Sequence, residues 1–132
     1  NIEMKDYEKY IKKYLKERGW DNLRPADLAK SIAIESAELL EIFQWTNQSL
    51  AEVKKDKIKM EMIKKELADV FNYCFDMSVL LGFDTEKILR DKIEKVKKKY
   101  PAHLFNKKNN SVDPGSEDIY WKIKKEHRMK GE

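Results

Sequence analysis

Two pairs of acidic residues constrain most strongly what this chain can fold into. Glu35 and Glu38 form the first pair, and Glu66 and Asp69 form the second, each with a spacing of three residues. Residues three apart are neighbours on the surface of an α-helix, with about 5–6 Å between their Cβ atoms. The two pairs therefore predict two helices, each of which directs two carboxyl groups at one place.

Apolar residues surround one member of each pair on a helical wheel, Glu35 in the first helix and Glu66 in the second. The flanking residues are Leu28, Ile32, Leu39 and Ile42 in the first, and Val70, Tyr73 and Met77 in the second. A carboxylate on a buried face costs free energy unless a cation compensates it, and a divalent metal ion bound by oxygen ligands does so. The alternative is a solvated helix face, where such spacing is common; two pairs on apolar stripes favour the metal site.

The rest of the chain also predicts helices, since it has only four Gly and three Pro and few alternating β-branched residues. We expect helices over about 2–18, 25–45, 49–81, 84–100 and 117–128, with Gly19 and Gly82 as stop signals. The lysine-rich start of the third can form a separate short segment, which leaves 56–81 for the longer helix. The predicted fold is an all-α bundle of four to five helices, with the two acidic helices packed antiparallel.

The balance of charge and core predicts an oligomer. Charged residues make up 39% of the chain, well above the usual quarter, while apolar residues make up 41%. So much solvated surface leaves a modest core for one subunit, and we expect the bundle to complete its core as a homo-oligomer, either a dimer or a tetramer. Residues 1–105 are expected to form one domain, followed by a polar linker and a C-terminal helix over 106–132.

The charge pattern gives no strong signal for nucleic acid or membrane. The net charge is only +4, with basic and acidic residues interleaved, a balance that suits phosphate-bearing ligands. The basic segment near the C-terminus, 122–130, is weak as a nucleic-acid contact. Docking of the last helix on the bundle or on a neighbouring subunit, through Ile119, Tyr120, Trp121 and Ile123, is the favoured alternative. The most apolar stretch, 70–83, is interrupted by Asn72 and Asp76 and is too short to span a bilayer. Without an apolar signal segment, we expect a cytoplasmic location.

Magnesium is the metal that the acidic pairs favour. Four carboxylates from two helices can hold one or two Mg²⁺ ions, and a pair of ions can activate water and neutralise a pyrophosphate leaving group. A ferritin-like di-iron site needs Glu-x-x-His on two helices, but neither His103 nor His127 follows a Glu by three. One Cys and two His also argue against zinc.

The acidic signature resembles that of a known family. Glu35-x-x-Glu38 followed by Glu66-x-x-Asp69 is similar to the signature of the MazG-like, all-α nucleoside triphosphate pyrophosphohydrolases. Further segments resemble the dCTP pyrophosphatase-like branch in order and spacing. These are Glu17-Arg18-Gly19-Trp20, residues 38–45, residues 66–70 and Lys99-Tyr100-Pro101. The resemblance covers about residues 5–104, so the 1–105 segment is interpreted as a MazG-like domain.

The resemblance implies a reaction and a set of ligands. It implies Mg²⁺-dependent cleavage of an NTP or dNTP to the monophosphate and pyrophosphate, as house-cleaning of the nucleotide pool, with Mn²⁺ as a substitute for Mg²⁺. Glu35, Glu38, Glu66 and Asp69 correspond to the metal ligands. The expected catalytic residues are Glu38 and Glu35, and we predict that Glu38 acts as the general base.

Base and phosphate contacts are implied in the same way. The residues expected at the nucleobase are Trp20, Trp45, Tyr73 and Tyr100, for which core packing is the alternative. Lys92 and Lys99 are the expected phosphate contacts, although cations near a helix C-terminus are common without a ligand.

Two positions depart from the dCTP-preferring relatives and leave the metal site intact. Val96 stands where those relatives usually place Asn, and Arg24 stands where they tend to have His or Gln. Val cannot hydrogen-bond a base edge, so we expect weaker base discrimination. The competing interpretation is a catalytically silent nucleotide-binding or interaction module of the same fold, against which the four retained acids argue.

Overall fold

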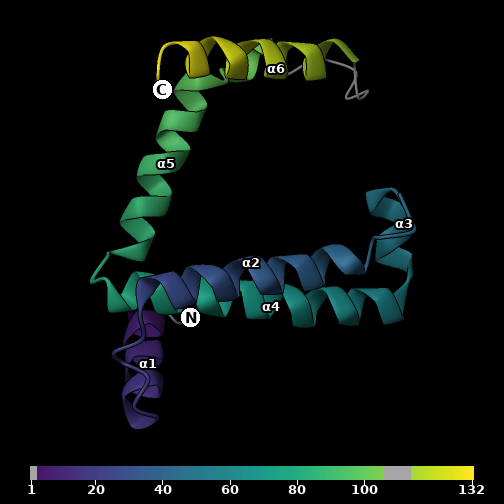
Figure 1. The fold of residues 1–132 in the computed structure, drawn as a ribbon. Coiled ribbons are helices and arrows are strands. Elements are labelled where there is room, and N and C mark those ends of the chain that lie inside the picture. Colours follow the sequence, from purple (N-terminus) through teal and green to yellow (C-terminus); the bar gives the residue numbers. More distant parts are fainter. Residues whose placement is uncertain (1–2, 106–113) are drawn as a thin grey trace. The chain divides into compact units, whose positions relative to one another are not determined.

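The computed structural model describes residues 3–105 and 114–132, and these residues form helices and connecting turns with no strand (Figure 1). The predicted all-α class is therefore confirmed. The six α-helices of the described residues are α1 (Met4–Glu17), α2 (Pro25–Glu41), α3 (Leu50–Lys55), α4 (Lys57–Leu80), α5 (Thr85–Lys99) and α6 (Pro114–Met129). A short 3₁₀ helix, Ala102–Leu104, follows α5.

Two glycines end helices as the sequence predicts. After α1, the Gly19 N–H donates to the Lys16 carbonyl and the Trp20 N–H to the Leu15 carbonyl, with φ of 68° at Gly19. The same pair of bonds follows α4 around Gly82, whose φ is 74°. This Schellman arrangement needs a left-handed residue, which glycine adopts without steric cost. It also fixes the position of Trp20 directly after α1.

Other helix boundaries differ from the predicted ones. α2 ends at Glu41, one turn before the predicted end at Trp45, because the N–H groups of Phe43 and Gln44 donate to carbonyls three residues earlier, Leu40 and Glu41, instead of four. The separate segment α3 is present, since Asp56 Oδ1 accepts a bond of 3.0 Å from the Lys59 N–H and caps α4. The last helix starts at Pro114 rather than at residue 117. Residues 106–113 of the predicted linker lie outside the described residues.

The chain divides into two compact units, residues 1–86 and 87–132. In the first unit α2 and α4 run antiparallel side by side, as predicted, and α1 and α3 also pack against α4 (Figure 1). The buried apolar side chains of the described residues are Ile11, Leu15 and Leu28, all in this unit. The start of α5 is tied to it, because the Thr85 N–H donates to Glu8 Oε1 at 2.8 Å.

The second unit contains most of α5, the 3₁₀ helix and α6. Its aromatic side chains form a cluster, in which Tyr100 stacks on Tyr120 with ring centroids 5.0 Å apart. Phe105 meets the edge of Tyr100, and Trp121 meets the edge of Tyr120. These contacts join the end of α5 to α6. The predicted domain boundary at 105/106 falls inside this unit and stays a prediction about where the family domain ends.

Large apolar side chains are exposed along α2 and α4. Leu40 is 69% exposed, Ile58 78% and Phe71 55%. Their exposure is consistent with the modest core expected from composition, and oligomerisation stays a prediction. No helix in the described part of the chain is long and apolar enough to cross a membrane.

Candidate active site

Three of the four predicted metal ligands come together where α2 and α4 face each other. One carboxylate oxygen from each of Glu35, Glu38 and Glu66 lies within 4.8 Å of the other two. Antiparallel packing of the two helices brings the acidic pairs to the same level, as their spacing on one helix face predicts. Asp69 is outside this group of three. It lies one turn further along α4 and lines a neighbouring cavity.

The three carboxyl groups are not neutralised by an ion pair within the described residues. Glu35 and Glu66 each bury one oxygen, Oε2, that has no hydrogen-bond partner. Among the described residues, no Lys or Arg forms an ion pair with any of the three. The Glu35 carboxyl raises the pKa of Glu38. Burial raises the pKa of Glu66, and the carboxyls of Glu38 and Asp69 add to this effect. Such crowding is unfavourable in the chain alone.

A divalent metal ion fits this arrangement. Carboxylate oxygens are hard ligands of the kind that Mg²⁺ and Mn²⁺ prefer. The two buried oxygens without partners are positions where coordination would replace a missing hydrogen bond. Glu38 is the exposed member of the group, so it is also open to solvent and to a ligand.

Beside the cluster lies a cavity of about 610 Å³. Its walls come from α1, the turn before α2, α2 and α4. The side chains that line it include Tyr7, Tyr10 and Tyr14 from α1, Trp20 and Leu23 from the turn, Asp27, Leu28 and Ser31 from α2, and Asp69, Asn72, Tyr73 and Asp76 from α4. On both α1 and α4 these residues follow a spacing of three and four, which places them on one helix face. The cavity therefore combines aromatic walls with carboxyl groups.

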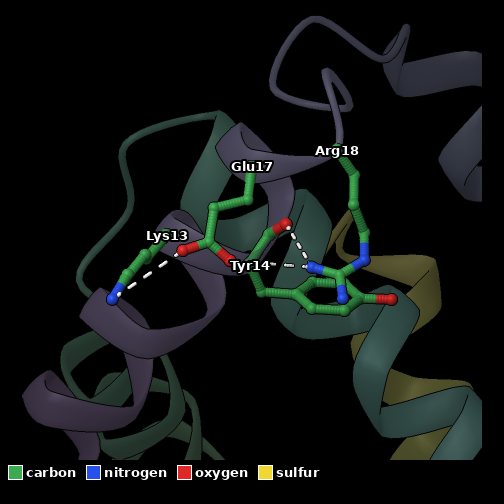
Figure 2. Close-up of polar contacts among 4 residues, drawn as sticks. All are labelled: Lys13, Tyr14, Glu17 and Arg18. Atoms are coloured by element: carbon green, nitrogen blue, oxygen red, sulfur yellow. Dashed lines mark hydrogen bonds and ion pairs between the residues drawn. The ribbon is translucent and has the colours of Figure 1, made fainter.

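The segment Glu17-Arg18-Gly19-Trp20 lies next to the cavity and contributes Trp20 to its wall. The Arg18 guanidinium lies over the Tyr14 ring, 4.1 Å from its centroid, and donates to the Tyr14 carbonyl oxygen at 3.1 Å (Figure 2). Trp20 meets the same Tyr14 ring edge-on, with centroids 6.0 Å apart. Arg18 and Lys13 also pair with Glu17. This segment, which the sequence resemblance singled out, thus holds two aromatic rings in place at the cavity.

Asp76 is a residue that the sequence reasoning missed. It lines the cavity, is only 8% exposed, and has no hydrogen bond to any described residue. Burial raises its pKa to about 6. In the sequence it stands out only as an interruption of an apolar stretch. Its spacing of seven residues from Asp69 was the available signal, because that spacing puts both carboxyls on the same face of α4.

The predicted nucleobase residues occupy three places. Trp20 and Tyr73 line the cavity. Trp45 lies beyond the other end of α2 and is 88% exposed. Since α2 has 17 residues, the two tryptophans of one chain are separated by roughly 25 Å along its axis. Tyr100 belongs to the second compact unit, where it stacks on Tyr120.

The predicted phosphate contacts, Lys92 and Lys99, also belong to the second compact unit. Lys92 is exposed on α5, and Lys99 Nζ lies 5.5 Å from the centroid of the Tyr100 ring. Their role at phosphate stays a prediction.

Comparison with known proteins agrees with the geometry. A crystal structure of a pyrophosphatase from Archaeoglobus fulgidus is similar, with 34% sequence identity and a TM-score of 0.64. The match covers 74% of this chain and 92% of the archaeal chain. No curated protein matches significantly. The sequence model of the MazG-like family matches residues 30–112, more than half of the chain. The chain therefore belongs to the MazG-like family.

Proposed function

We propose that this chain is a nucleotide pyrophosphohydrolase that cleaves an NTP or dNTP to the monophosphate and pyrophosphate. Its proposed role is house-cleaning of the nucleotide pool. The observation that carries the proposal is the group of three carboxyls, two of which bury an oxygen without a hydrogen-bond partner, beside an aromatic cavity. The archaeal relative, a pyrophosphatase, supports the same class of reaction.

Glu35, Glu38 and Glu66 would hold the metal, with Asp69 one turn away as the fourth acidic group. When bound, Mg²⁺ supplies neutralisation of phosphate charge and acidification of water. We assign the general base to Glu38. A carboxylate oxygen of Glu38 accepts the proton of the attacking water as the bond to the α-phosphorus forms and the bond to the pyrophosphate oxygen breaks. Glu38 is the exposed member of the three acids, so water can reach its carboxylate.

The cavity is the proposed site for the base. Trp20 and Tyr73 offer ring faces or edges to a purine or pyrimidine, and stacking on aromatic side chains tolerates every base. Trp45 lies too far from Trp20 in one chain to touch the same base. If both contact it, as the sequence predicts, Trp45 must come from a second copy of the chain. The predicted homo-oligomer would provide that copy.

Pyrophosphate release from a panel of NTPs and dNTPs tests the function. We expect release with Mg²⁺ or Mn²⁺, none with EDTA, and recovery when Mg²⁺ is restored. The competing hypothesis, a silent nucleotide-binding module, predicts nucleotide-dependent quenching of tryptophan fluorescence without pyrophosphate release. Absence of turnover across the whole panel would refute the proposed activity.

A further inference from the structure

Asp76 is a buried carboxyl group without a partner at the wall of the cavity. Only 8% of its surface is exposed, and no hydrogen bond joins it to a described residue, so its carboxylate oxygens can accept from a group in the cavity that Asp76 lines. The neighbouring Asn72 Oδ1 already accepts a bond from the Tyr7 hydroxyl at 3.3 Å. Asp76 therefore remains available to a ligand in the cavity.

The other groups that line the cavity give Asp76 no cation. α1 contributes Tyr7, Tyr10 and Tyr14, α2 contributes Asp27 and Ser31, and α4 contributes Asp69. Among the lining residues there is no Lys, Arg or His. A ligand group that meets Asp76 in this setting is favoured if it is a hydrogen-bond donor, because a carboxylate only accepts.

The position of Asp76 suits the far end of a nucleotide. Asp69 lines the cavity beside the carboxyl cluster, and Asp76 lies two turns further, roughly 10 Å along the axis of α4. A nucleotide whose phosphates bind at Glu35, Glu38 and Glu66 would extend along this face. Its sugar would then pass Tyr73, and the edge of its base would approach Asp76.

We propose that Asp76 determines base specificity by accepting a hydrogen bond from an exocyclic amino group. The inference rests on the proposed function and names its substrate class: nucleotides of guanine, cytosine or adenine are favoured over those of hypoxanthine, uracil or thymine. Guanine, cytosine and adenine each carry an amino donor. Uracil and thymine have a carbonyl oxygen in place of the cytosine amino group, and hypoxanthine has a carbonyl oxygen in place of the adenine amino group and a hydrogen in place of the guanine 2-amino group. A carbonyl oxygen facing the Asp76 carboxylate would leave two acceptors unpaired, and a hydrogen would leave the carboxylate without its donor; both are unfavourable.

This specificity comes from a different place than the sequence suggested. Val96 predicts weak discrimination because it cannot hydrogen-bond a base. Asp76 would supply a polar contact from α4 instead. Burial raises the pKa of Asp76, and an amino donor from the base would stabilise the ionised form again.

Matched nucleotide pairs test the proposal directly. GTP and ITP differ only by the 2-amino group, and CTP and UTP differ at the 4-amino position. We expect the wild-type chain to favour GTP over ITP and CTP over UTP by about tenfold to a hundredfold in kcat/KM, since one unpaired buried group has an effect of this size. Asp76→Asn, which can donate as well as accept, should reduce both ratios to within about fivefold.

Asp91→Asn is the matched control. Asp91 lies on α5, is not among the residues that line the cavity, and forms an exposed ion pair with Lys87 at 2.6 Å. The control should keep both wild-type ratios. A role of Asp76 in stability alone would alter activity on all nucleotides together and leave the ratios unchanged. Circular dichroism melting confirms that each variant is folded. If Asp76→Asn does not fold, the wild-type ratios decide the proposal.

The outcomes separate this inference from the proposed function. Turnover of all nucleotides with ratios near one, or with a preference for ITP and UTP, would overturn the role of Asp76 and leave the activity in place. If no nucleotide is cleaved, the proposed function fails. In that case the same ratios are measured as affinities by tryptophan fluorescence. Equal affinities within both pairs would then overturn the inference as well.

Discussion

At the scale of single residues, the crowded carboxyls of Glu35, Glu38 and Glu66 should oppose folding until a cation binds. The buried Oε2 atoms of Glu35 and Glu66 have no partner. We therefore predict that Glu66→Gln raises the melting temperature in EDTA and removes the further rise that Mg²⁺ gives the wild type. Pyrophosphate release should fall by more than about a hundredfold, since even the loss of groups behind a metal ligand can have that effect. Differential scanning fluorimetry and a pyrophosphate assay measure the two effects.

Glu61→Gln is the matched control for this prediction. Glu61 lies on the same helix, is 72% exposed and pairs with Lys64 at 2.8 Å. Because exposed ion pairs contribute little, its removal should change neither the Mg²⁺ effect nor the rate noticeably. A Glu66→Gln variant that keeps both its Mg²⁺ stabilisation and its activity would show that the metal binds elsewhere.

Asp76 predicts a specific dependence of stability on pH. Its pKa rises from 3.8 to about 6 in the folded chain. The folded chain therefore holds this proton more tightly than the unfolded chain between these two values. The free energy of unfolding should fall as the pH rises from about 4 to about 6, by at most about 3 kcal/mol, and this loss should persist above pH 6.

Asp76→Asn removes that loss. Its stability relative to the wild type should grow from pH 4 to pH 6 and then level off, as measured by urea unfolding in EDTA without nucleotide. A difference between the two chains that is constant over this range would mean that the Asp76 carboxyl is not perturbed in the folded chain.

Residue patterns led to three acids that the structure brings together, whereas the base contacts stay a prediction. Glu35 and Glu66 could be identified because local helix geometry alone places each beside its partner acid and inside an apolar stripe. Asp76 could not, because its burial depends on α1 and α2 packing around it. The roles of Trp20 and Trp45 depend on tertiary placement, and the structure puts them at opposite ends of α2.

At the scale of elements, the junction between α3 and α4 depends on one capping residue. Asp56 Oδ1 accepts from the Lys59 N–H at 3.0 Å and starts the helix that carries Glu66. We predict that Asp56→Ala lowers the free energy of unfolding by about 1 kcal/mol, the usual contribution of an N-cap. Urea unfolding measures the change. Asp56→Asn, which keeps an acceptor, should retain most of the stability; an equal loss in both variants would assign the effect to the charge of Asp56 instead.

Helix boundaries could be predicted where a residue's own chemistry sets them. Gly19 and Gly82 end α1 and α4 because the left-handed conformation at each suits glycine. Pro25 begins α2 because its missing N–H needs no partner in a first helical turn. The early end of α2 had no such local signal. Lys59, on α4, donates hydrogen bonds to the side chains of Thr46 and Gln48, which follow α2 in the chain. A contact between separate elements such as this one cannot be predicted from the local sequence pattern.

At the scale of the whole molecule, exposed apolar side chains predict self-association. Leu67, Phe71 and Cys74 on α4 follow a spacing of four and three and are all exposed, which forms an apolar strip on one helix face. We predict that the chain sediments as a dimer or tetramer at micromolar concentration and that Phe71→Glu shifts it toward the monomer. Met129→Glu is the control, because Met129 is 80% exposed at the end of α6 and belongs to the other compact unit. A compact 15.8 kDa wild-type monomer would contradict the prediction.

Association should also decide whether Trp45 takes part in nucleotide binding. In one chain Trp45 is separated from the cavity residue Trp20 by the length of α2, so it can reach the base only from another copy. Trp45→Phe should therefore reduce the quenching of tryptophan fluorescence by nucleotide in the oligomer. In the Phe71→Glu background, where the chain is a monomer, adding Trp45→Phe should leave the quenching unchanged. Trp20→Phe should reduce it in both backgrounds, since Trp20 lines the cavity of its own chain. Equal quenching with and without Trp45 in the oligomer would show that this side chain does not contact the base.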